Sequence, residues 1–273
     1  MDLKLGNKHF VITGGTGGIG EAIISLLYKE GAKISVLYFK NIQKARELAE
    51  SYNNQNINFI QCDLRKEDEV KKFFKTSTEH FGRIDGLVAN AGIWVSDSIL
   101  TSKMSLKQWE NIIQVNLTGV FLCVKEFFLN LENYPEDNAS LVLIGSTAGL
   151  FGEAGHADYS ATKAALMYGL TKTWKNEIVS FAKLGRVNTV APGWVNTPMA
   201  KESLKDDKVV RKILQSIPIQ KIATPFDIAS LTVFLLSDRV ASHLNGETIM
   251  VHGGMEGRVL YDIDQTKLDN IDK

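Results

Sequence analysis

Short segments rich in β-branched residues alternate with longer amphipathic segments along most of the chain. The short segments, which we predict to be strands, span residues 9–13, 33–38, 58–61, 86–89, 141–145, 186–190 and 248–251. The segments with apolar residues at helical spacing span residues 20–30, 42–52, 67–81, 105–131, 157–182 and 226–236. Such alternation requires crossover connections and a parallel sheet with helices on both faces. We therefore expect an α/β fold, a doubly wound parallel sheet of about seven strands.

Two segments interrupt this alternation. Residues 131–138 form a polar stretch around Pro135, which we expect to be a loop. Residues 197–224 contain no strand pattern and are rich in lysine and helix formers. The sequence fits both a movable helical flap and an ordinary surface segment without a function of its own. We predict one domain over residues 1–257, with the flap inside it, followed by a mixed-charge tail over residues 258–273, either disordered or docked on a neighbouring subunit.

Charge and composition exclude several kinds of partner. The chain has 31 basic and 31 acidic residues, so it has no global field to attract nucleic acid or an anionic membrane. A strand pattern begins almost at the N-terminus, without room for a signal peptide, and we find no apolar stretch long enough to span a membrane. We expect a cytoplasmic protein. Cys62 and Cys123 are expected to be buried reduced thiols, and the histidines lack metal-ligand spacing.

The most specific local signal is the run Thr13-Gly14-Gly15-Thr16-Gly17-Gly18-Ile19-Gly20, directly after the first predicted strand. A P-loop is excluded because Glu21 and Ala22 stand where lysine and serine or threonine are needed. The segment from Gly15 to Gly20 fits G-x-G-x-x-G between a strand and a helix, the Rossmann-type arrangement for a dinucleotide pyrophosphate. A purely structural glycine turn is the alternative.

The end of the second predicted strand bears on the choice of nucleotide. An acidic residue there would bond the adenosine ribose of NAD(H), but the chain has Tyr38-Phe39-Lys40. No carboxylate repels a 2′-phosphate, and Lys40 is close enough to attract one. We predict NADP(H) as the preferred cofactor, with NAD(H) as the alternative.

A nicotinamide enzyme that interconverts a carbonyl and an alcohol needs a group that transfers a proton. Ser146 follows the fifth predicted strand, and Tyr159 and Lys163 lie one turn apart on the next long helix. The lysine charge, with that of the oxidised nicotinamide, is expected to lower the tyrosine pKa. Tyr168 and Lys172 have the same spacing but point to nearly the opposite face, so we assign them to the core or a subunit contact.

Several motifs in the same order resemble the short-chain dehydrogenase/reductase family from about residue 5 to residue 255. The glycine run resembles the family's TGxxxGIG turn, Cys62-Asp63-Leu64 its adenine-contacting Asp-Leu, and Ala89-Asn90-Ala91-Gly92 its NNAG element, with Ala89 in place of the first Asn. Asn116, Ser146, Tyr159 and Lys163 match the catalytic tetrad. The segment from Pro192 to Thr197 resembles the PG segment that holds the nicotinamide carboxamide. The late V-H-G-G stretch has His252 where the family commonly has aspartate.

The resemblance implies a role for each matching residue. Tyr159 is the acid/base, Lys163 holds the nicotinamide ribose and lowers the tyrosine pKa, Ser146 bonds the substrate oxygen, and Asn116 holds a water for proton relay. An ordinary mid-helix asparagine and a plain turn serine are the alternatives for the last two. The predicted cofactor contacts are Gly14, Thr16, Gly17, Gly18, Ile19, Gly20, Tyr38, Lys40, Asp63, Leu64, Asn90, Ala91, Gly92, Tyr159, Lys163, Pro192, Gly193, Val195 and Thr197.

The predicted substrate pocket is mostly apolar and aromatic. It contains Trp94, Phe151, His156, Trp194 and Met199, although His156 also fits an ordinary loop histidine. This favours a carbonyl on an apolar or acyl group, such as an acyl thioester, and 3-oxoacyl carrier-protein reductases have similar late segments. The alternatives are an NAD(H)-dependent alcohol, steroid or sugar dehydrogenase and a nucleotide-binding regulator without turnover. The resemblance implies a homotetramer or dimer built on the helices at residues 105–131 and 157–182.

Overall fold

The computed structural model describes residues 2–52 and 55–266 and contains a seven-stranded parallel sheet. Its strands are β1 (His9–Thr13), β2 (Lys33–Tyr38), β3 (Ile57–Gln61), β4 (Gly86–Ala89), β5 (Ser140–Ile144), β6 (Arg186–Pro192) and β7 (Thr248–Val251). The strand order is β3-β2-β1-β4-β5-β6-β7. From β1 the successive strands β2 and β3 are added on one side, and from β4 the later strands are added on the other side. A crevice therefore opens between the carboxyl ends of β1 and β4. The predicted fold class and all seven strands are confirmed, and only the bounds of β3, β5 and β6 differ, by one or two residues.

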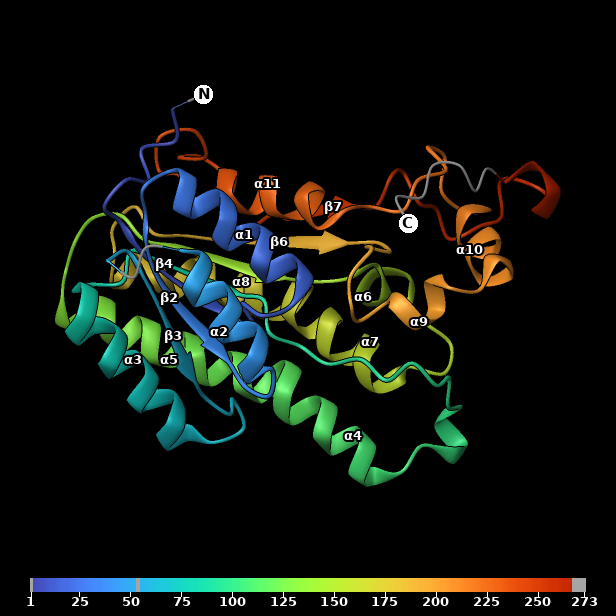
Figure 1. Ribbon diagram of the computed structural model, residues 1–273, viewed down its shortest axis with the longest axis horizontal. Helices are drawn as coiled ribbons and strands as arrows, with labels where there is room; N and C mark the ends of the chain where they lie inside the picture. The colour runs from blue at the N-terminus through green and yellow to red at the C-terminus, as the bar shows by residue number, and fades with distance from the viewer. Residues whose placement is uncertain (1, 53–54, 267–273) are drawn as a thin grey trace.

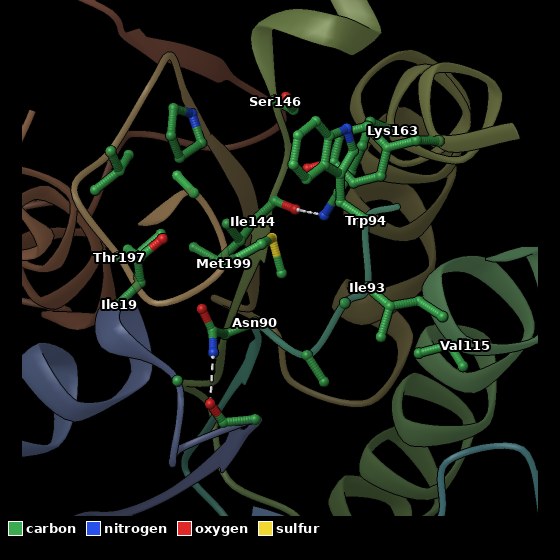
Figure 2. Close-up of a pocket in the computed structure, with 18 of the residues that line it drawn as sticks. Ile19, Asn90, Ile93, Trp94, Val115, Ile144, Ser146, Lys163, Thr197 and Met199 are labelled. Atoms are coloured by element: carbon green, nitrogen blue, oxygen red, sulfur yellow. Dashed lines mark hydrogen bonds between the residues drawn. The ribbon is translucent and has the colours of Figure 1, made fainter. Parts of the chain in front are cut away.

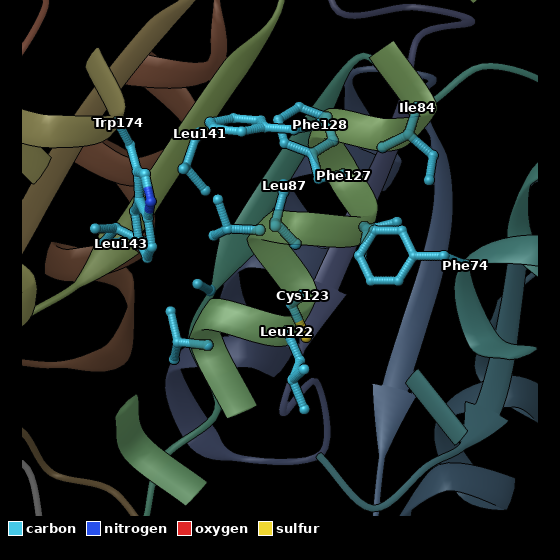
Figure 3. Packing of buried hydrophobic residues seen from close by; sticks show 14 of the residues in the cluster. Phe74, Ile84, Leu87, Leu122, Cys123, Phe127, Phe128, Leu141, Leu143 and Trp174 are labelled. Carbon is cyan, nitrogen blue, oxygen red and sulfur yellow. The ribbon is translucent and has the colours of Figure 1, made fainter. Parts of the chain in front are cut away.

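Helices cover both faces of this sheet (Figure 1). They are α1 (Gly18–Lys29), α2 (Ile42–Ser51), α3 (Glu67–Phe81), α4 (Leu106–Ile113), α5 (Gly119–Asn133), α6 (Thr147–Phe151), α7 (Ala157–Ala164), α8 (Thr171–Glu177), α9 (Lys201–Leu204), α10 (Asp207–Leu214) and α11 (Pro225–Leu236). Helices α1 and α11 pack together over one apolar layer, whereas α3, α5 and α8 cover the other. In the second layer Phe74, Phe127 and Trp174 pack against Leu87 and Leu141 of the sheet (Figure 3).

Each of the two long predicted helices contains a π-helical turn. The first turn, Gln114–Thr118, joins α4 to α5, and the second, Ala165–Leu170, joins α7 to α8. Helix α5 also runs to Asn133, so the predicted loop over residues 131–138 begins three residues later than expected. The hydrophobic periodicity of the sequence did not reveal these two π turns. Such turns often occur at functional sites.

The segment Leu106–Asn133 is long and apolar enough to cross a membrane by length and composition alone. The sequence-based expectation that no such segment exists was therefore wrong, because residues 111–131 carry charges at only two positions, Lys125 and Glu126. Half of the apolar 18-residue stretch within Leu106–Asn133 is buried inside the fold, as in the central helix of a packed domain.

Part of the segment at residues 197–224 is helical, and its role as a movable flap remains a prediction. It contains α9 and α10, with a small apolar core of its own around Val210, Leu214 and Ile217. The described part of the tail packs on this segment: the Arg211 side chain donates hydrogen bonds to the Thr266 carbonyl at 3.0 Å and hydroxyl at 3.3 Å. Through residue 266 the tail therefore contacts its own chain, and residues 267–273 lie outside the described residues.

Candidate active site

A cavity of about 580 Å³ opens at the carboxyl ends of the strands, where the sheet order reverses. Its walls come from the glycine run, the loops after β2 to β6, and helices α6 and α7 (Figure 2). The predicted residues that line it are Gly14, Thr16, Gly17, Gly18, Ile19, Lys40, Asp63, Leu64, Asn90, Ala91, Gly92, Trp94, Ser146, Phe151, Tyr159, Lys163, Pro192, Gly193, Trp194, Val195, Thr197 and Met199. Motifs that are far apart in the sequence thus meet around one space.

The glycines of the run at residues 13–20 have different structural roles. Gly14 has a φ of 68°, and a Cβ there would lie 2.8 Å from the Ala91 Cα. A Cβ on buried Gly20 would lie 2.5 Å from the Gly14 carbonyl oxygen, so this glycine allows α1 to pack against the turn. Gly17 is exposed in the cavity wall, and the only neighbour near its Cβ position is the Gly14 oxygen at 3.4 Å. Packing inside the protein explains why residue 20 is a glycine. The space beside Gly17, in contrast, is open to a ligand.

Asn90 fixes this turn to the neighbouring strand. Its side-chain amide donates hydrogen bonds to the carbonyl oxygens of Thr13, at 3.0 Å, and Gly14, at 3.1 Å, and one of these bonds is drawn in Figure 2. The Thr13 hydroxyl in turn accepts hydrogen bonds from the backbone N–H groups of Asn90 and Ala91, both at 3.0 Å. The carboxyl ends of β1 and β4 are therefore locked together beneath the cavity.

Two cations flank one aromatic ring at the end of β2. The Lys40 ammonium lies 5.7 Å and the Arg65 guanidinium 5.5 Å from the centroid of the Phe39 ring. Arg65 also donates to the buried Asp63 carboxylate at 2.7 Å, and this hydrogen bond lowers the pKa of Asp63. Arg65 and Phe39 line the cavity but were not among the site residues predicted from the sequence. The basic residue directly after Asp63-Leu64 could have indicated Arg65.

Ser146 and Tyr159 form the polar centre of the cavity. Ser146 caps α6, because its hydroxyl accepts a hydrogen bond from the Ala148 N–H at 3.1 Å. The Ser146 side chain also acts on the Tyr159 hydroxyl, whose pKa it lowers. Part of the Tyr159 ring is exposed in the cavity, but its hydroxyl is enclosed, and burial raises the pKa of Tyr159 to about 12. The Ser146 side chain acts in the opposite direction, and the Glu153 charge raises the pKa further.

Lys163 lies beside Tyr159, but its ammonium points elsewhere. It donates a hydrogen bond to the Ile144 carbonyl oxygen at 2.7 Å and lies 5.6 Å from the centroid of the Tyr159 ring (Figure 2). Burial lowers the pKa of Lys163 to about 8. The expected lowering of the Tyr159 pKa is not seen in this structure, where desolvation dominates.

Asn116 lies in the π turn that joins α4 to α5, fully buried and behind the cavity wall. Its side-chain oxygen accepts from the Ile93 N–H at 2.8 Å, and its side-chain nitrogen donates to the Ile93 carbonyl at 2.9 Å. These bonds hold the loop that carries Gly92 and Trp94. The expected water relay remains a prediction.

The second tyrosine and lysine pair lies away from the cavity, as the helical phase predicted. Tyr168 is 47% exposed, and Lys172 donates to the Gly246 carbonyl. Neither lines the cavity.

The other end of the cavity is largely aromatic. Trp94 packs edge-on against Trp194, with ring centroids 6.1 Å apart, and the centroid of the His156 ring lies 5.1 Å from that of Trp94. His156 is buried behind Trp94 and does not itself line the cavity. Glu153, which the sequence analysis did not single out, does line it.

Four predicted site residues are absent from the cavity wall: Gly20, Tyr38, Asn116 and His156. Gly20 and Asn116 support the turn and loop described above, and His156 supports Trp94. The side chain after Tyr38, Phe39, faces the cavity instead, since neighbouring residues of a strand point to opposite sides. A direct ligand contact by any of the four remains a prediction.

The described residues contain no cluster of three or more His, Cys, Asp or Glu side chains placed to hold a metal ion. Cys62 and Cys123 are both buried and free, and burial raises the pKa of the Cys62 thiol to about 12.

The chain is similar to known proteins in sequence and in overall fold. A sequence profile described as enoyl-(acyl carrier protein) reductase matches residues 14–256. The 3-oxoacyl-[acyl-carrier-protein] reductase FabG of Staphylococcus epidermidis is 36% identical over 251 residues, covering 91% of this chain and 99% of the relative. The 3-oxoacyl-[acyl-carrier-protein] reductase of Synechocystis sp. is 36% identical, covering 90% and 95%. The crystal structure of a short-chain dehydrogenase/reductase from Brucella melitensis, described as a glucose/ribitol dehydrogenase, has a TM-score of 0.85 at 33% identity, with coverage of 94% and 99%.

Proposed function

The chain belongs to the short-chain dehydrogenase/reductase family and is an oxidoreductase acting on CH–OH donors; we propose that it is an NADP(H)-dependent reductase of ketones or 3-oxoacyl groups. The observation that carries the proposal is that Ser146 and Tyr159 line the same cavity as the glycine turn, with Ser146 close enough to the Tyr159 hydroxyl to lower its pKa. The residue proposed to transfer the proton, Tyr159, and the turn proposed to bind the dinucleotide therefore line the same cavity.

The residues of the cavity fit a nicotinamide dinucleotide. The backbone of Gly17 is open, and α1 begins at Gly18, so its free N–H groups and dipole favour a pyrophosphate. Lys163, Pro192, Gly193 and Val195 also line the cavity, where they would hold the nicotinamide ribose and carboxamide. Thr197 lies close to Gly18 of the glycine turn.

When bound, NADPH supplies a hydride to the carbonyl carbon. In the proposed mechanism the Ser146 and Tyr159 hydroxyls both hydrogen-bond to the carbonyl oxygen, and Tyr159 gives its proton to the developing alkoxide. A pKa of about 12 keeps Tyr159 protonated at neutral pH, which suits a proton donor in the reductive direction. In the oxidative direction the tyrosinate would need the positive charge of the oxidised nicotinamide and Lys163.

The preference for NADP(H) rests on Lys40 and Arg65 around Phe39. A 2′-phosphate carries up to two negative charges and would gain charge-assisted hydrogen bonds from both cations. The carboxylate of Asp63, which also lines the cavity, is already paired with Arg65.

The substrate is proposed to be a small-molecule carbonyl compound on an apolar or acyl group, an acyl thioester included. The walls formed by Trp94, Phe151, Trp194 and Met199 favour such a group, and the FabG relatives carry names of 3-oxoacyl-[acyl-carrier-protein] reductases. The similarity to the Brucella melitensis protein, described as a glucose/ribitol dehydrogenase, favours a polyol or sugar dehydrogenase as the second candidate.

We further propose a homo-oligomer in the cytoplasm. Leu106, Trp109 and Phe121 on the α4–α5 helix and Tyr168 beyond α7 are large apolar side chains exposed to solvent. Pairing these helices between subunits would cover them. Light scattering at micromolar concentration tests this, and a monomer would contradict it.

Turnover tests the activity. The protein is mixed with NADPH and, separately, NADH, and the absorbance at 340 nm is followed with ketones, 3-oxoacyl thioesters and, in the reverse direction, polyols. The proposal predicts oxidation of NADPH by ketones or oxoacyl thioesters. Efficient polyol oxidation with NAD⁺ and no ketone reduction would favour the second candidate.

A further inference from the structure

The loop between α6 and α7 carries a carboxylate into the substrate end of the cavity. Glu153 lies between Gly152 and Gly155, whose φ values are 75° and 86°. Its backbone N–H donates to the hydroxyl of Ser160, the residue directly after Tyr159, at 3.1 Å. The position of Glu153 is therefore tied to that of the tyrosine.

The same loop is held from its other side. The Ile99 N–H donates to the Gly155 carbonyl at 3.0 Å, and the Ser98 hydroxyl donates to the Ala154 carbonyl at 3.3 Å. A Cβ on Gly155 would lie 1.9 Å from the Ser98 Oγ, so the two segments pack closely. Since the loop backbone is bonded on both sides, the position from which the Glu153 side chain enters the cavity wall is held in place.

The Glu153 carboxylate has no strong counter-ion. Its Oε1 lies 3.8 Å from His156 Nε2, and no lysine or arginine of the described residues is within ion-pair distance. Burial raises the pKa of Glu153, while His156 and a hydrogen bond from Trp94 act in the opposite direction. Its charge also raises the pKa of Tyr159, so the carboxylate is within electrostatic reach of the reacting hydroxyl. A carboxylate accepts up to about four hydrogen bonds, and its remaining acceptor sites are available to a ligand.

We propose that Glu153 selects substrates that carry a hydroxyl group on the carbon next to the carbonyl, and accepts a hydrogen bond from that hydroxyl. This inference rests on the proposed carbonyl reduction at Tyr159 and narrows its substrate class to α-hydroxyketones. The surrounding walls are apolar, so Glu153 is the polar anchor available at this end. A site built to hydrogen-bond a hydroxyl rejects the analogue without one, because its buried polar group is then left unpaired.

Matched pairs of ketones test the proposal. Hydroxyacetone is compared with butanone, and acetoin with isopropyl methyl ketone, because each pair exchanges a hydroxyl for a methyl group. The ratio of kcat/KM within each pair is measured with NADPH for the native protein, Glu153→Leu and Glu153→Gln. Glu79→Gln, an exposed carboxylate on α3, is the matched control.

The native protein is expected to prefer the hydroxylated member of each pair. Glu153→Leu should lower the ratio about tenfold or more, since a hydrogen bond to a charged group is lost, and Glu153→Gln should lower it less, since the amide oxygen still accepts. The control should leave the ratio unchanged. A ratio that stays within about twofold in Glu153→Leu would overturn the proposal.

A second measurement separates this proposal from the proposed function. Absence of all ketone reduction by the native protein would refute the proposed function alone. Thermal stabilisation of the NADPH-saturated protein by the product diols, relative to the matching mono-alcohols, needs no turnover. It should favour the diols in the native protein and not in Glu153→Leu; equal stabilisation in both proteins would overturn the role of Glu153.

Discussion

The Lys163 ammonium donates a 2.7 Å hydrogen bond to the carbonyl oxygen of Ile144, the last residue of β5. This bond joins the helix that carries Tyr159 to the strand that precedes Ser146. The lysine therefore helps to position both hydroxyls, although it does not touch the phenol oxygen.

Burial of Lys163 lowers its pKa from 10.5 to about 8, so its charge is a cost to folding at neutral pH. The unfolded chain binds more protons than the folded one between about pH 8 and 10.5, so stability rises with pH over that window. The shift corresponds to about 3 kcal/mol and the lost hydrogen bond, which a charged group donates, to about 1.5–3 kcal/mol, so Lys163→Met should stabilise the ligand-free protein at pH 7 by up to about 2 kcal/mol. Urea unfolding at pH 7 and 10 measures this; a less stable Met variant at pH 7 would contradict it.

Gly17 and Gly20 are predicted to differ when each is replaced by alanine. Gly20→Ala places a methyl group 2.5 Å from the Gly14 oxygen and should lower both the unfolding midpoint and the NADPH affinity. Gly17→Ala meets only ordinary contacts and should weaken NADPH binding with little effect on stability. Calorimetric titration and thermal unfolding of both variants test the difference, and an equal loss of stability in the two would argue against it.

Lys40 is predicted to contribute to the preference for NADPH over NADH. Lys40→Asp replaces an attractive charge by a repulsive one and should reduce the NADPH to NADH ratio of kcat/KM by about tenfold or more, because charge-assisted hydrogen bonds contribute about 1.5–3 kcal/mol. Lys75→Asp, on an exposed part of α3, serves as the control. An unchanged ratio in Lys40→Asp would exclude Lys40 as a 2′-phosphate contact.

His9 is predicted to make the fold sensitive to acid. Its Nδ1 faces the carbonyl oxygens of Gly82 and Arg83, its Nε2 lies 2.9 Å from the Ser35 hydroxyl, and burial lowers its pKa to about 4. The unfolded chain takes up a proton near pH 6.5, so stability falls as the pH drops from 6.5 to about 4, by about 3 kcal/mol. His9→Gln should show a smaller difference in unfolding free energy between pH 7 and 4.5. An equal difference in both proteins would exclude His9 as the source.

The sequence predicts the sheet and the gathering of its motifs because strand-helix alternation and strand-end position are local properties. Helical phase, together with the helix end that meets the carboxyl edge of the sheet and with Ser146 on the adjoining loop, placed Tyr159 in the cavity and Tyr168 outside it. The contributions of Arg65 and Glu153 depend on packing between loops, which periodicity does not encode. The raised pKa of Tyr159 was missed for the same reason, because the depth of burial of its hydroxyl is set by the surrounding tertiary structure.

The role of Tyr159 is the centre of the proposed function, and Tyr159→Phe tests it most directly. The change removes the transferable proton and leaves the ring, so kcat for carbonyl reduction should fall by a factor of about 10² to 10⁴ while NADPH binding is kept. Tyr168→Phe, the same change at an exposed site, should have no effect. If Tyr159→Phe bound NADPH and reduced the substrate at close to the native rate, Tyr159 would not be the proton donor.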